Sequence, residues 1–195
     1  MSLSFPTSNP GVSELAKQIS QALPLVGVDY GIIHTEFKIN THGQVKVLEV
    51  NPRLAGDMLG SHCVPFATGI DTAKALVELA LGHIDAVPFV AEKQHGAAII
   101  GIYADEVGRF DDFANLSDVE SFLSREALNH QILVWKKQGE HLRPPQSNAD
   151  LLGRIAVEAP TAEEALLLCR RAVMMLQINY LPQPERAYSS LFSPT

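Results

Sequence analysis

The sequence predicts an α+β fold, and two features of the chain support that prediction. Residues 28–39 and 44–51 alternate apolar and polar side chains as strands do, and the turn sequence NTHG (40–43) joins them as a hairpin. From residue 97 onward, short apolar strands alternate with amphipathic helices. We therefore expect an antiparallel sheet with flanking helices, followed by a small C-terminal α/β domain.

The first helix and the end of the hairpin are marked by local signals. A helix is expected over 9–23, because Asn9 is a capping residue and Pro10 suits the first helical position. Its apolar stripe is Val12, Leu15, Ile19 and Leu23. Pro52 ends the second strand, because proline cannot donate a hydrogen bond to a ladder.

The segment after the hairpin, residues 53–70, is rich in glycine and small side chains and is expected to be mostly irregular. A helix follows, which Asp71 caps and Gly82 ends. The apolar stripe expected on this helix is Ala73, Leu76, Val77 and Ala80.

The second half is expected to contain strands at 97–104, 106–111, 130–137 and 153–159, a helix at 116–124 and a proline-marked loop at 139–150. Its best specified element is the last helix, where Thr161 and Glu164 form a capping box. The stripe of that helix is Ala165, Leu168, Cys169, Ala172, Val173 and Leu176. We place a soft domain boundary near residue 93, which gives units at 1–93 and 94–185 and a loose tail at 186–195.

The composition excludes several classes of protein. The chain has 195 residues, of which 46% are hydrophobic and 19% charged, as in an ordinary globular protein. Its formal charge of −7 argues against nucleic acid or an anionic membrane as the main partner. No apolar stretch is long enough to span a bilayer, no secretory signal opens the chain, and the two cysteines lie in unrelated contexts. We therefore expect a cytoplasmic protein.

The hairpin brings acidic side chains together. Strand side chains alternate between faces, so Glu49 and Asn51 point the same way. If the turn pairs Ile39 with Gln44, Glu36 becomes a diagonal neighbour of Glu49 on the same face, roughly 7–8 Å away. That distance is short enough for one cation to bridge the two side chains.

The side chains at this strand end indicate a metal site. Two carboxylates aimed at one point repel each other unless a cation lies between them or one takes up a proton. Oxygen ligands from Glu36, Glu49 and Asn51 suit magnesium or manganese rather than zinc. Arg53, just beyond the strand, would clamp phosphate or carboxylate oxygens. A solvated hairpin face carrying acids, lysines and a histidine is the alternative.

The segment from about residue 24 to 83 resembles the C-terminal lobe of the ATP-grasp superfamily, in the branch of biotin carboxylases and L-amino-acid or carnosine-type ligases. The motifs that carry the resemblance are the His-x-Glu-Phe strand (34–37), the Glu-x-Asn-x-Arg strand end (49–53), the Thr-Gly-Ile-Asp segment (68–71) and the helix that ends at Gly82. The later segment 139–176 is similar to the small domain that follows the grasp in these enzymes.

The resemblance implies an ATP-dependent ligase. Such enzymes activate a small carboxylate with ATP as an acyl phosphate, which an amine or another nucleophile attacks, and two Mg²⁺ or Mn²⁺ ions hold the triphosphate. By resemblance, Glu36, Glu49 and Asn51 are the metal ligands, with the two acids serving the bound nucleotide. Arg53 steadies the acyl phosphate or the tetrahedral intermediate. The family has a second glycine where this chain has Asp57, which would contact a substrate ammonium or cap the loop.

The nucleotide clamp of the family, with its lysines and glycine-rich loop, does not precede Val28. We therefore expect a C-terminal fragment that is inactive alone and completed by N-terminal lobes of the same enzyme. Two alternatives are a fragment of a biotin-carboxylase-type subunit and a non-catalytic α+β association module with a degenerate hairpin. The identity of the carboxylate and of the nucleophile stays open, as does a homodimer.

Other side chains are weaker candidates. His34, His62 and Cys63 lack the paired spacing of a zinc site. His34 either orients Glu49 or is a plain cross-strand partner. The simpler interpretations are a solvated Lys38, a packed Cys63, Arg143 in an ordinary loop, and Trp135 with Met174 and Met175 in the core.

Overall fold

The computed structural model describes residues 2–3, 10–28, 31–84 and 93–182. The strands are β1 (Ser2–Leu3), β2 (His34–Ile39), β3 (Val45–Asn51), β4 (Gly96–Tyr103), β5 (Gly108–Phe113), β6 (Asn129–Val134), β7 (His141–Leu142), β8 (Leu151–Ala159) and β9 (Ile178–Tyr180). They form a four-stranded sheet in the order β1-β4-β8-β6, the β2–β3 hairpin, and a small sheet in the order β7-β5-β9. Every pairing is antiparallel, and the predicted α+β fold is confirmed.

The α-helices are α1 (Pro10–Ala22), α2 (Val64–Thr68), α3 (Thr72–Ala80), α4 (Leu116–Glu126) and α5 (Ala162–Met175). Shorter helical turns cover Leu23–Val26, Leu59–Cys63 and Asn148–Asp150. None of the helices in the described ranges is long and apolar enough to cross a membrane. The predicted cap Asn9 and the predicted tail at 186–195 lie outside the described residues.

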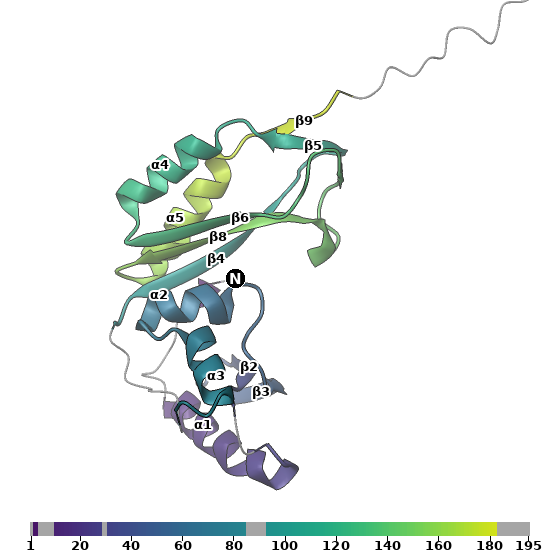
Figure 1. The fold of residues 1–195 in the computed structure, drawn as a ribbon. Coiled ribbons are helices and arrows are strands. Elements are labelled where there is room, and N and C mark those ends of the chain that lie inside the picture. The colour runs from purple at the N-terminus through teal and green to yellow at the C-terminus, as the bar shows by residue number, and fades with distance from the viewer. Residues whose placement is uncertain (1, 4–9, 29–30, 85–92, 183–195) are drawn as a thin grey trace, which may run out of the picture.

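The larger sheet carries the main core. Helices α4 and α5 cover one face of it, while α2 lies against the other face (Figure 1). The capping box of α5 is confirmed, because Thr161 Oγ1 accepts from the Glu164 amide at 3.2 Å and Glu164 Oε2 accepts from the Thr161 amide at 3.1 Å. The predicted stripe of α5 is also confirmed, with Ala165, Leu168, Cys169 and Ala172 buried and Val173 and Leu176 packed against them.

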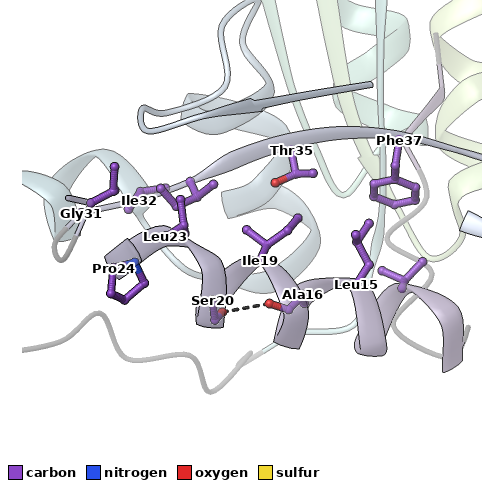
Figure 2. A pocket seen from close by; sticks show the side chains of 13 residues that line it. Leu15, Ala16, Ile19, Ser20, Leu23, Pro24, Gly31, Ile32, Thr35 and Phe37 are labelled. Carbon is purple, nitrogen blue, oxygen red and sulfur yellow. Dashed lines mark hydrogen bonds between the residues drawn. The ribbon is translucent and has the colours of Figure 1, made fainter. Parts of the chain in front are cut away.

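Helix α1 packs against one face of the hairpin. An apolar groove of about 490 Å³ lies between them. Figure 2 shows Leu15 and Ile19 of α1 on one side of this groove and Thr35 and Phe37 of β2 on the other. Because strand side chains alternate, the face that carries Glu36 is turned away from α1.

Two predicted boundaries in the first half are wrong. The strand expected from residue 28 begins only at His34, since Gly31 has a φ of +117°, which an extended strand does not accommodate. The segment expected to be irregular is helical from Leu59 to Thr68. Its small residues serve close packing instead: a Cβ on Gly60 would lie 2.9 Å from the carbonyl oxygen of Ala55.

The cap of α3 is confirmed but its predicted stripe is wrong. Asp71 accepts a hydrogen bond from the Lys74 amide at 2.9 Å. The buried positions are Ala75 and Leu79, which pack near Ile32, whereas Ala73, Val77 and Ala80 are exposed and Leu76 is half-buried. Apolar residues cover most of the helix circumference, with Lys74 and Glu78 on the remaining side, so periodicity alone does not identify the packed face.

The second half departs from prediction in two respects. The proline-marked loop contains the short strand β7, and β9 follows α5. Trp135 and Met174, predicted in the core, are 46% and 85% exposed, whereas Met175 packs against the core. Trp135 follows the last residue of β6, and Met174 lies off the apolar stripe of α5, so neither reaches the interior.

Candidate functional site

The hairpin places the predicted ligand residues on one face. Glu36 pairs directly with Glu49, and His34 pairs with Asn51, so all four side chains lie on the same side of the two strands. The predicted register is wrong in detail, because Ile39 pairs with Val45 rather than with Gln44. The two carboxylates are therefore directly opposite and not diagonal. Cβ atoms of directly opposite residues lie about 4.5–5.5 Å apart.

The turn and a bulge cause the change of register. Asn40 Oδ1 accepts hydrogen bonds from the amides of His42 and Gln44, and the Asn40 amide donates to the Gln44 carbonyl at 3.0 Å. This side-chain scaffold keeps Gln44 inside the turn, and Gly43 takes a φ of +76° there. A bulge then inserts Leu48 between the Phe37–Val47 and Glu36–Glu49 pairs.

The described residues provide no counter-charge to the two carboxylates. Glu36 and Glu49 are exposed, and neither forms an ion pair or a side-chain hydrogen bond with any residue that the structure describes. Lys38 pairs with Lys46 next along the same face, without an ion pair to either acid. Like charges opposite each other destabilise a hairpin, so this face favours an ion that binds both acids.

The donor set fits a magnesium or manganese ion. Glu36, Glu49 and the amide oxygen of Asn51 offer oxygen atoms alone, and the Asn51 Nδ2 and His34 Nδ1 atoms are buried without a hydrogen-bond partner among the described residues. The described ranges hold no group of three or more His, Cys, Asp or Glu side chains that could bind a metal. Two carboxylates and an amide would fill only part of the coordination sphere of a magnesium ion. Proteins usually supply about this many ligands where substrate phosphates provide the others.

Arg53 lies two residues after the end of β3. Its amide donates to the Asn51 carbonyl at 2.8 Å, and its Nη1 donates to the Leu54 carbonyl at 2.9 Å. The guanidinium is exposed and has no carboxylate partner in the described part of the chain. It is therefore available to bind an anion.

The segment after Arg53 turns sharply into a helix. Asp57 and Met58 have φ values of +55° and +65°, the only positive values among the described residues that are not glycine. Asp57 Oδ2 lies 2.9 Å from Arg154 Nη2 on β8. Sequence reasoning missed Arg154, although a cation inside the apolar run of β8 was a signal that could have drawn attention to it.

The weaker candidates have local roles. Cys63 is fully buried, and burial raises the pKa of its thiol to about 12, which confirms that it is packed. Burial also lowers the pKa of His62, whose Nδ1 lies 2.8 Å from Ser61 Oγ. Arg143 Nε donates to Asp150 Oδ1 at 2.7 Å, so it stabilises its own loop.

Comparisons with known proteins identify the fold. No known protein family and no curated protein matches the sequence. Among solved structures, an L-amino acid ligase from Bacillus licheniformis matches with a TM-score of 0.73 at 19% identity, over 92% of this chain and 45% of that chain. A phosphoribosylglycinamide synthetase from Anaerococcus prevotii matches with a TM-score of 0.74 at 12% identity, over 92% and 44%. A biotin carboxylase from Campylobacter jejuni matches with a TM-score of 0.61 at 17% identity, over 86% and 36%.

These solved structures are ATP-grasp enzymes, and the fold of this chain is the fold of part of such an enzyme. At these identities the likeness concerns the fold alone. The chain spans less than half the length of the ligase and the synthetase that it matches.

Proposed function

We propose that the chain is the C-terminal part of an ATP-dependent ligase that joins a small carboxylate to an amine through an acyl phosphate. The observation that carries the proposal is the hairpin face: two carboxylates directly opposite each other, an amide two pairs further along on the same face, and an exposed arginine just beyond the strand. The ATP-grasp fold supports it, because its solved relatives include a ligase for L-amino acids. We also retain the predicted boundary near residue 93 as a proposal.

In this proposal Glu36, Glu49 and Asn51 hold the divalent ions that accompany ATP. When bound, these ions supply positive charge to the triphosphate oxygens. The substrate carboxylate attacks the terminal phosphorus of ATP, the bond from that phosphorus to the bridging oxygen breaks, and ADP leaves. The amine nitrogen then attacks the acyl carbon, inorganic phosphate leaves, and the proton of the amine passes to solvent.

Arg53 acts on the charge that develops in both steps. Its guanidinium is exposed just beyond the strand end and, among the described residues, forms one hydrogen bond, to the Leu54 carbonyl. A fork of N–H donors matches the oxygens of a phosphoryl group or of a tetrahedral intermediate. Arg53 therefore stabilises negative charge where it forms, which is the largest contribution that such a group makes to a rate.

The test of the reaction uses the longer protein that contains this chain. With ATP, magnesium and a panel of carboxylates, the acyl phosphate should be trapped by hydroxylamine as a hydroxamate, and ADP release should depend on the carboxylate. Glu49→Gln should abolish both signals, whereas Glu120→Gln on α4 should leave them intact. ADP release that is indifferent to every carboxylate and gives no hydroxamate would refute the ligase.

The test of the metal site uses the chain alone. Manganese binding is followed by the electron paramagnetic resonance signal of the free ion. The wild-type chain should bind manganese weakly, the Glu36→Gln and Glu49→Gln variants should bind less, and Glu120→Gln should match the wild type. Equal binding by all four proteins would remove the hairpin as the metal site and would favour the association module.

A further inference from the structure

The Asp57–Arg154 ion pair joins the candidate site to a distant strand. Arg154 lies on β8, in the middle of the larger sheet, and its side chain is only 13% exposed, whereas that of Asp57 is 57% exposed. The guanidinium lies 6.0 Å from the centre of the Trp135 ring, and its Nε is buried without a partner among the described residues. The carboxylate of Asp57 is thus the one charged partner that the described residues give to a largely buried cation.

A second contact anchors the same segment to the same strand. Met58 is 7% exposed and packs in a cluster with Ala156, two residues further along β8, and with Ala97 and Ile99 of β4. Residues at positions 154 and 156 of a strand lie on one face, so the polar and the apolar anchor are adjacent. Asp57 and Met58 are held at both side chains while their backbones are in the left-handed region.

The strained backbone needs this support. A left-handed conformation is unfavourable for aspartate and more so for methionine, and such residues persist only where surrounding contacts hold them. Only three residues separate Arg53 from Asp57, so the position of Asp57 limits where the chain can place the arginine. The hydrogen bonds from the Leu59 and Gly60 amides to the Gly56 and Ala55 carbonyls, at 2.9 and 3.3 Å, close the same turn.

We propose that Arg154 is a positioning residue of the candidate site, which holds the segment 53–58 and hence Arg53 through its ion pair with Asp57. The role of the held arginine in catalysis rests on the proposed function, whereas the holding itself does not. The second half of the chain thereby contributes to a site that the hairpin forms. In this proposal Asp57 serves the loop through its ion pair with Arg154 rather than by contact with a substrate ammonium.

Hydrogen exchange of the chain alone tests the holding. Asp57→Asn removes the charge but keeps a residue that tolerates the left-handed region, and Asp57→Gly removes the charge and the strain together. In Asp57→Asn and in Arg154→Gln, the Leu59 and Gly60 amides should exchange about tenfold faster, while the amides of the β4–β8 ladder stay unchanged. Arg154→Lys, which keeps a cation, and Glu120→Gln should preserve most of the wild-type protection.

Two results of the exchange experiment would overturn the proposal. Unchanged exchange at Leu59 and Gly60 in Asp57→Asn means that the ion pair holds nothing. Faster exchange throughout the β4–β8 ladder means that Arg154 supports the whole sheet and not the segment. Asp57→Gly removes the charge and also relieves the backbone strain, so it separates the two effects. If Leu59 and Gly60 exchange as slowly in this variant as in the wild type, the ion pair only offsets an unfavourable backbone conformation, and the proposal fails.

Kinetics of the longer protein tests the consequence. Asp57→Asn should lower kcat for hydroxamate formation about tenfold and leave the KM for ATP unchanged, because in the proposed function Arg53 acts on the charge that develops during the reaction and not on bound ATP. Faster local exchange with an unchanged kcat would refute the positioning role in catalysis. If the wild-type protein forms no hydroxamate, the proposed function fails, while the exchange results still decide whether Arg154 holds the segment.

Discussion

Glu36 and Glu49 lie directly opposite each other on the exposed face of the β2–β3 hairpin, and no described cation pairs with either of them. The pairing depends on the bulge at Leu48, since without that extra residue Glu49 would oppose a different neighbour. Two facing acids oppose the folding of a hairpin. In the proposed function a bound ion that carries positive charge offsets this repulsion.

Because the two acids face each other, we expect the folding stability of the chain to depend on divalent ions. In the presence of a chelator, Glu49→Gln should raise the free energy of unfolding of the chain by about 0.3 kcal/mol, because it removes a repulsion. Thermal melts with and without manganese measure the effect, and manganese should stabilise the wild type but not the variant. Lys46→Gln is the control, because it removes the neighbouring pair of like charges, Lys38 and Lys46. This variant should be more stable than the wild type in chelator and should still be stabilised by manganese. A Glu49→Gln variant that is less stable in chelator contradicts the repulsion.

Replacement of Arg53 is expected to slow the reaction without unfolding the protein. In the longer protein, Arg53→Ala should lower turnover by ~10²-fold or more, as removal of a charge-stabilising group usually does. Because the side chain is exposed and, among the described residues, bonds only to the Leu54 carbonyl, the melting temperature should change little. Steady-state kinetics and a thermal melt on the same preparation check both statements. A near-normal rate excludes the catalytic role.

The hydrogen bonds of Asp150 indicate that its loop contributes less to folding stability at acid pH. The hydrogen bond from Arg143, and then those from the Gln146 and Ser147 amides, hold the pKa of Asp150 at about 2 instead of 3.8. A lowered pKa in the folded state contributes stability above pH 4, and that contribution is lost as the pH falls from about 4 to about 2. Urea unfolding between pH 5 and pH 2.5 should show a smaller pH dependence for Asp150→Asn than for the wild type. Parallel curves for the two proteins would rule out this linkage.

The two thiols should be unreactive in the folded chain. Cys63 and Cys169 are fully buried, and burial raises the pKa of each to about 12. At pH 8 an alkylating reagent should therefore modify neither residue until denaturant is added, when both react. Mass spectrometry before and after unfolding measures this, with a small exposed-thiol peptide as the positive control. Rapid labelling of Cys63 in the native chain would place it at an accessible surface.

Local signals predicted much of the fold. Capping residues such as Thr161 and Asp71 marked helix starts correctly, because a cap is a short-range hydrogen bond that the sequence contains in full. Strand alternation correctly placed Glu36, Glu49 and Asn51 on one face of the hairpin. This placement is the same in every register that puts the two acids on one side of the sheet. Their roles as ligands stay a prediction.

Longer-range packing explains what the sequence did not show. The register depended on the Asn40 side chain and on a bulge at Leu48, and neither has a distinctive pattern. The helical segment before α3 is stabilised by Cys63 and Phe66 against the sheet, so it depends on contacts far along the chain. The same is true of Arg154, whose importance appears only once β8 is placed beside Asp57.

The Asp57–Arg154 pair also bears on recombination between this chain and others of the same fold. A chimera joined within residues 85–92 would take its arginine-bearing turn from one parent and its β8 from the other. Unless both parents carry matching partners at the two positions, the hybrid would inherit a lone buried guanidinium and a misaligned turn. Exchanging positions 57 and 154 together would let the two halves of different enzymes be combined.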